Sequence, residues 1–155
     1  MAEENLPEHV DVLIVGAGLS GIGAACQLSE QCPEKSFVIL EARGATGGTW
    51  DLFRYPGIRS DSDMFTLGYK FRPWPGSKVL ADGESILTYM RETADRYGIS
   101  DRVRLNRKVL RGDWSSATQQ WTVTVEDTVS GETTTMTASH IHACAGYYDF
   151  DQGYL

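Results

Sequence analysis

Several features that would assign a chain to a special class are scarce in this sequence of 155 residues. No apolar run approaches the roughly 18 residues that a membrane-spanning helix requires. The three cysteines, Cys26, Cys32 and Cys144, cannot all pair with each other and show no zinc-site spacing. We therefore expect free thiols, the usual state in a reducing compartment.

Positive charge is also scarce, because 14 Lys and Arg residues stand against 21 Asp and Glu residues and leave a net charge of −7. An acidic surface repels nucleic acid and anionic membranes. The first nine residues are acidic where a secretory signal would need a basic region and an apolar run. These observations predict a cytoplasmic protein without nucleic-acid or membrane partners.

Metal-binding residues form no recognisable motif. His140 and His142 lie two apart on a predicted strand and so share one face, but no carboxylate or thiolate motif accompanies them. A metal ligand pair and a structural role are both open to these histidines. The missing motif favours the structural role, and we expect no metal site.

The order of elements in the first 41 residues is typical of a βαβ unit. An apolar run over Val10–Val15 predicts a buried strand, and a glycine turn over 16–21 leads into a helical pattern. Pro33 ends the helix, and Phe37–Leu40 predicts a second buried strand that Glu41 closes. Such a unit is almost always right-handed and places its two strands parallel.

The turn contains Gly16, Gly18 and Gly21 in the spacing G-x-G-x-x-G, and Glu41 follows 20 residues after the last glycine. Gly16 permits a tight turn, Gly18 lets the backbone approach a pyrophosphate, and Gly21 lets the helix pack closely on the strand. The helix N-terminus offers N–H groups to phosphates. Ser20 is either a phosphate contact or a helix-start residue.

Glu41 indicates which dinucleotide this first site takes. At the end of the second strand a carboxylate accepts hydrogen bonds from ribose hydroxyls. The same carboxylate repels a 2′-phosphate, so the ligand is FAD or NAD rather than NADP. A glycine turn without any ligand is the alternative.

The remaining sequence predicts a Rossmann-like α/β domain with a parallel sheet, crossover helices and an antiparallel β-meander. Residues 42–60 have no periodicity and predict a functional loop. A helix begins after Asp82 and stops at Gly98. Alternating apolar residues over 103–138 predict the antiparallel meander, and the apolar run 141–145 predicts a return to the parallel sheet.

Several motifs in this order resemble the class B flavin monooxygenases, and most closely the Baeyer–Villiger monooxygenases of the ethionamide-activating type. The resemblance covers nearly the whole chain. The motifs that carry it are Gly47-Gly-Thr-Trp50, Arg54-Tyr-Pro-Gly57, Arg59-Ser-Asp61, Phe71-Arg-Pro-Trp74 and Gly146-Tyr-Tyr148.

The resemblance implies roles for individual residues. Five would line the flavin of FAD: Gly48, Thr49, Trp50, Asp51 and Leu52. Three would reach bound NADP: Arg59, Ser60 and Asp61. Asp61 would also lie beside the isoalloxazine ring, which makes it the candidate catalytic residue, and the backbone of Val109 would contact the adenine end.

The chemistry that the resemblance implies is oxygen transfer. NADPH reduces the flavin, oxygen forms a C4a-peroxyflavin, and this oxidises a small-molecule ketone or a heteroatom such as the sulfur of a sulfide. The arginines of the loop suit a phosphate-bearing cofactor. Arg54 and Arg59 are alternatively surface or salt-bridged residues.

The chain departs from the family in one respect, because members run to several hundred residues and carry a second glycine motif for NADPH. We therefore expect residues 1–155 to be the FAD-binding domain of a longer enzyme, inactive alone and prone to self-association. A stand-alone FAD- or NAD-binding module without oxygenase activity, or another FAD-dependent reductase, are the alternatives. A disulfide reductase is disfavoured, because Trp50 stands where such enzymes place a redox cysteine.

Overall fold

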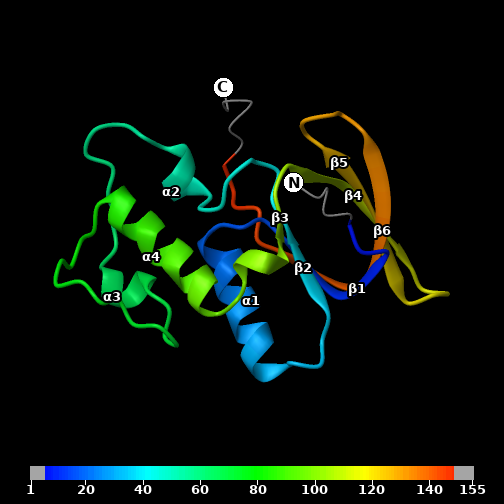
Figure 1. Cartoon of the computed structure of the whole chain (residues 1–155), viewed down its shortest axis with the longest axis horizontal. Coiled ribbons are helices and arrows are strands. Elements are labelled where there is room, and N and C mark those ends of the chain that lie inside the picture. The colour runs from blue at the N-terminus through cyan, green and yellow to red at the C-terminus, as the bar shows by residue number, and fades with distance from the viewer. Residues whose placement is uncertain (1–5, 149–155) are drawn as a thin grey trace.

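The computed structural model describes residues 6–148, and a six-stranded sheet runs through them. The strands are β1 (His9–Val15), β2 (Phe37–Leu40), β3 (Val103–Arg104), β4 (Arg107–Ser115), β5 (Gln120–Asp127) and β6 (Thr133–Ala143). The helices are α1 (Leu19–Gln31), α2 (Thr49–Leu52), α3 (Met64–Leu67) and α4 (Gly83–Arg96), with a 3-10 turn over Ser100–Arg102. Figure 1 shows α1 and α4 to one side of the central strands and the β4–β6 meander on the other.

The predicted βαβ unit is present. The sheet order is β3-β2-β1-β6-β5-β4, and β1 lies parallel to both β2 and β6. Leu13 and Ile14, which point to opposite faces, are both buried, as expected for a central strand. Helix α1 ends at Gln31, two residues before Pro33.

The meander was predicted with two errors of extent. Val103 belongs to β3, which pairs parallel with β2, because alternation of apolar residues looks the same on any half-buried strand. The apolar run predicted over 141–145 is also not a separate strand, because residues 141–143 continue β6, which ends at Ala143; they do pair parallel with β1, as expected. The first half of β6 pairs antiparallel with β5 and its second half parallel with β1, so a single strand joins the meander to the parallel sheet.

The loop predicted over 42–60 contains the one-turn helix α2, and α3 follows shortly after it. Neither was predicted, because a single turn is too short to show a helical period. Asp63 caps the start of α3, since its side chain accepts a hydrogen bond from the backbone N–H of Thr66 at 2.9 Å.

Helix α4 has the predicted start and stop. The Asp82 carboxylate accepts hydrogen bonds from the backbone N–H and the hydroxyl of Ser85, at 2.9 and 2.8 Å, and these bonds lower the pKa of Asp82 to about 2. Gly98 ends the helix region with a positive φ of 65°.

We expect Asp82→Ala to lower the free energy of unfolding by about 1 kcal/mol near neutral pH, because the helix loses its N-terminal cap. Since the folded-state pKa of Asp82 is depressed, this stabilisation is present above its ordinary value and is lost as the pH falls towards about 2. Urea unfolding at several pH values measures the difference. Asp82→Asn keeps an acceptor and serves as the control; a loss of equal size in both variants would contradict the cap.

Within residues 6–148, no helix is long and apolar enough to cross a membrane. All three cysteines are free thiols, and burial raises the pKa of Cys26 to about 11. The acidic residues Glu3 and Glu4, which support the prediction that no secretory signal is present, lie outside the described residues.

Candidate dinucleotide-binding site

A cavity of about 1080 Å³ lies at the carboxyl ends of β1, β2 and β6. Residues from four separate segments line it, within 16–20, 41–50, 53–62 and 143–148, together with Leu67 of α3. In open α/β sheets, ligands bind at the carboxyl ends of the strands. They lie at the topological switch point, where the strand order reverses. The volume is at the upper end of the range for small-molecule sites, as a long ligand requires.

The three glycines of the first turn have different structural roles. A β-carbon at position 16 would lie 2.5 Å from the carbonyl oxygen of Cys144, and one at position 21 would lie 1.9 Å from the carbonyl oxygen of Gly16. At position 18 a β-carbon would meet only Gly48 Cα, at an ordinary 3.6 Å. Gly16 and Gly21 are therefore required for close packing, whereas Gly18 keeps space open in the cavity.

The N-terminus of α1 is left uncapped. Gly18 is the N-cap residue, no side chain makes a capping hydrogen bond, and the first turn holds no acidic residue. The N–H groups of that turn and the positive end of the helix dipole are thus available to an anion. Ser20 is exposed and lines the cavity beside them.

Glu41 is almost fully buried, with 6% of its surface exposed. Its Oε2 accepts from the backbone N–H of Ala17 at 2.8 Å and its Oε1 from that of Arg43 at 3.0 Å. These bonds hold the carboxylate rigidly, and each oxygen keeps a lone pair for another donor. The arrangement fits a ribose hydroxyl at this point of the cavity wall.

A second glycine turn packs on the first. The backbone N–H of Gly47 donates to the carbonyl oxygen of Ala17 at 3.0 Å. Gly47 and Gly48 have positive φ angles of 126° and 52°, and Gly48 lies against Gly18. This contact directs Thr49 and Trp50, at the start of α2, into the cavity wall.

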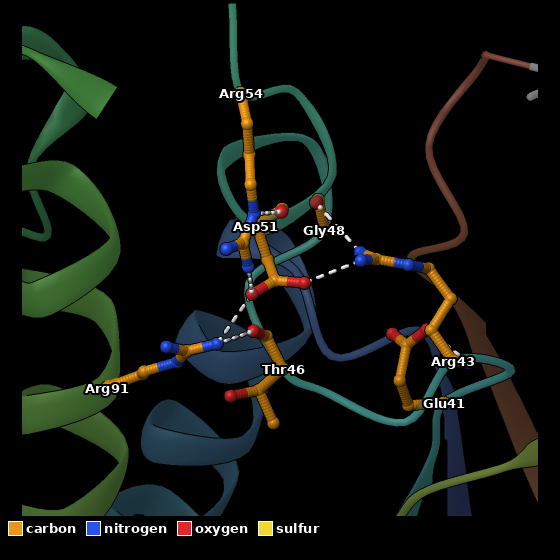
Figure 2. A network of polar contacts seen from close by, with 7 residues as sticks. All are labelled: Glu41, Arg43, Thr46, Gly48, Asp51, Arg54 and Arg91. Carbon is orange, nitrogen blue, oxygen red and sulfur yellow. Dashed lines mark hydrogen bonds and ion pairs between the residues drawn. The ribbon is translucent and has the colours of Figure 1, made fainter. Parts of the chain in front are cut away.

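Asp51 is the centre of an arginine network, which Figure 2 shows. Its carboxylate, with 3% of the side chain exposed, is paired with Arg43 at 2.5 Å, Arg91 at 2.7 Å and Arg54 at 3.1 Å. Burial acts to raise the pKa of Asp51, but the hydrogen bonds and charges of Arg43 and Arg91 outweigh burial and lower it. The network ties the end of β2, helix α2 and helix α4 together.

Most predicted site residues meet at the cavity. Ten line it: Gly16, Gly18, Ser20, Glu41, Gly48, Thr49, Trp50, Arg59, Ser60 and Asp61. Four are not among its lining residues: Gly21, Asp51, Leu52 and Val109. Val109 lies on β4 against the core cluster between the central strands and the meander. The ligand contacts of Leu52 and Val109 stay predictions.

The residues predicted to reach NADP differ in their surroundings. Ser60 is buried, and its backbone N–H and its hydroxyl oxygen are both hydrogen-bonded to the backbone of Ala81, at 2.9 and 3.2 Å. These bonds make Ser60 a structural link to the start of α4. Arg59 and Asp61 are exposed on the cavity wall. Arg54 forms a salt bridge with Asp51, which is the alternative to cofactor binding that the sequence left open for it.

The rim of the cavity is aromatic. Phe53 lies 6.3 Å from Tyr55 and 6.0 Å from Tyr148 between ring centroids, and Tyr147 lies 4.5 Å from Tyr148. Two motifs of the sequence, one in the loop after α2 and one after β6, therefore meet here. Sequence reasoning did not assign site roles to these rings or to Arg43; the position of Arg43, two residues after Glu41, was the available signal.

The uncapped helix, the glycine turns and the buried acid define a Rossmann-like dinucleotide-binding domain. The family model for the NAD(P)-binding Rossmann-like domain matches residues 14–75. Beyond this class, the chain is similar over nearly its whole length to part of several FAD-containing monooxygenases.

The chain is 56% identical over 149 residues to the FAD-containing monooxygenase EthA of Mycolicibacterium smegmatis and 52% identical to EthA of Mycobacterium tuberculosis. Each alignment covers 96% of this chain, which spans only 30% of the length of these relatives. Among solved structures, an oxidized steroid monooxygenase bound to NADP superposes with a TM-score of 0.79 at 29% identity, covering 89% of this chain and 26% of the other. OTEMO in complex with FAD and NADP superposes with a TM-score of 0.76 at 27% identity, covering 88% and 26%.

Proposed function

We propose that this chain is the FAD-binding portion of an NADPH-dependent flavin monooxygenase. The observation that carries the proposal is the space kept open at Gly18, beside the uncapped N-terminus of α1 and within the same cavity as Glu41. This arrangement offers one subsite for a diphosphate and one for a ribose. Bound FAD would supply the redox chemistry for Baeyer–Villiger oxidation of a ketone or for oxidation of a heteroatom such as sulfur, with NADPH as reductant.

The residues of this chain bind and shield the cofactor in this proposal. Glu41 holds the ribose, and the N-terminus of α1 holds the diphosphate. Thr49 and Trp50 line the flavin, and the aromatic rim around Phe53 excludes water from it. Arg59 and Asp61 are the exposed polar groups that face the nicotinamide cofactor, and Asp61 is the candidate catalytic residue.

The proposal extends to the setting of the domain. The relatives are about three times longer, which supports a second dinucleotide-binding domain for NADPH in the whole enzyme. In the described part of the chain, residues 139–143 of β6 pair with β1 but not with β5, and such a strand edge favours self-association. The three free thiols are consistent with a cytoplasmic location.

The first test is retention of flavin by the purified chain. We expect a flavin absorption spectrum to remain after FAD is added and the protein is desalted, because the proposed diphosphate and ribose subsites are contained in these residues. We expect Glu41→Ala to weaken FAD binding by about 10- to 100-fold, the cost of a lost hydrogen bond to a charged group.

The Glu41 variant needs a folding control, since its carboxylate also holds the N–H groups of Ala17 and Arg43. Glu41→Gln keeps one oxygen acceptor and should bind FAD more tightly than Glu41→Ala at a similar melting temperature. Equal FAD affinity in the wild type and Glu41→Ala would show that the ribose assignment is wrong. A wild-type chain that stays colourless would contradict the proposed function itself.

A further inference from the structure

We infer that Arg43 is a further cofactor-binding residue, which holds the diphosphate of the bound dinucleotide, and that Asp51 is its positioning residue. This inference rests on the proposed FAD site. Neither role follows from the motifs of the sequence, because Arg43 lies outside them and Asp51 was expected to line the flavin.

Arg43 lies between the two subsites that the cavity offers. Its backbone N–H binds the Glu41 carboxylate, while its Nη1 donates to the carbonyl oxygen of Gly48 at 3.2 Å. Gly48 in turn lies against Gly18, where a β-carbon on Gly48 would be only 3.1 Å from Gly18 Cα. The guanidinium is therefore close to the glycine contact at which the diphosphate is expected.

The charge of Arg43 suits this position. Two of its N–H groups serve Gly48 and Asp51, which leaves further N–H groups on a side chain that lines the cavity and is 31% exposed. A diphosphate carries two negative charges, whereas the helix N-terminus supplies only about half a positive charge. A guanidinium binds phosphate oxygens through paired N–H groups and supplies the missing charge.

Asp51 acts on the cofactor through Arg43. It does not line the cavity, and its Oδ2 is paired with Arg43 while its Oδ1 is held by Arg54 and Arg91. Arg91, on α4, also donates to the carbonyl oxygen of Thr46 at 2.9 Å. The carboxylate is thus anchored from the side away from the cavity, and it fixes the plane of the Arg43 guanidinium (Figure 2).

The test compares ADP with adenosine as ligands of the whole chain, by calorimetry, since only ADP carries the diphosphate. We expect Arg43→Ala to weaken ADP and FAD binding by about 10- to 100-fold and adenosine binding by less than about twofold. Arg43→Lys should recover part of the loss. Equal losses for ADP and adenosine, or none for ADP, would overturn the role of Arg43.

The role of Asp51 is tested by a double-mutant cycle. Asp51→Asn should weaken ADP binding in the wild type but add almost no further loss in the Arg43→Ala background, because the two residues act through one contact. Additive losses would overturn the positioning role. Arg111→Ala is the matched control, since it breaks an exposed arginine–aspartate pair, with Asp113, that lies outside the cavity. It should bind ADP as the wild type does, and a loss equal to that of Asp51→Asn would count against the inference.

Two further points keep the outcomes distinct. If Asp51→Asn does not fold, Arg43→Lys still tests the contact of residue 43 with the diphosphate. A lysine at this partly exposed position keeps a positive charge beside Asp51, so the buried carboxylate is not left without a partner. If the wild-type chain binds neither FAD nor ADP, the proposed function fails. If the wild type binds both and Arg43→Ala binds them equally well, only this inference fails.

Discussion

The Gly18→Ala chain is expected to fold like the wild type and to lose about 100-fold in FAD affinity. An added β-carbon has ordinary room in the protein, since it would meet Gly48 Cα at 3.6 Å, and the residue has an unstrained φ of −83°. The methyl group would instead occupy space beside the N-terminus of α1, where the diphosphate is proposed to lie. Overpacking of a close contact costs about 1–3 kcal/mol, and the upper value corresponds to this loss.

The measurement is a pair of titrations, FAD binding followed by flavin fluorescence and unfolding followed by circular dichroism. Gly44→Ala is the control, because its β-carbon would meet only the flexible side chain of Asn106, at 3.3 Å, outside the cavity. It should change neither quantity. Wild-type FAD affinity in Gly18→Ala would show that the diphosphate does not approach this turn.

For Gly21→Ala we expect the opposite result, a loss of fold stability of about 3 kcal/mol or more. The β-carbon would lie 1.9 Å from the carbonyl oxygen of Gly16, which is backbone and is held by the turn after β1. Helix α1 would have to move away from the strand, and the contacts of Ile22 and Cys26 with the core would loosen. In a domain of this size the melting temperature should fall by about 6–12 °C.

The fold stabilities of Gly18→Ala and Gly21→Ala are compared by thermal and urea unfolding. The comparison is matched, since both variants add one methyl group to the same turn. Any loss of FAD binding by Gly21→Ala should be recovered on cooling to conditions where the variant is folded. A melting temperature within about 2 °C of the wild type would show that the close packing of α1 on β1 is not needed.

The elements that the sequence predicted carry strong local patterns. Strands β1 and β2 are apolar on both faces, and α4 has an apolar stripe between a capping Asp82 and a terminal Gly98, so local chemistry and burial agree. The short helix α2 and the parallel pairing of β3 could not be predicted. One turn of helix or two residues of strand carry too little pattern, and their partners are far away in the sequence.

In the candidate site, too, the sequence predicted the features that are local in the chain and missed those that depend on packing. The glycine spacing and the acid after the second strand are local, because a dinucleotide site needs its turn, helix start and carboxylate within one βαβ unit. The cavity wall is not local, since the loop after α2 meets residues 143–148 from the other end of the domain. Arg43 appeared as one more arginine of a polar loop until its partners were placed.

By itself, the sequence determined the class of this domain, its parallel βαβ core and the residues, Gly16–Gly21 and Glu41, at which we propose that a dinucleotide binds. Only the tertiary structure decided that Gly16 packs against the backbone of Cys144, and that Asp51 faces three arginines. The physical reason is the range of the interactions. Periodicity and turn chemistry act between neighbours in the chain, whereas the contacts of Gly16 with Cys144 and of Asp51 with Arg91 exist only after the elements have packed.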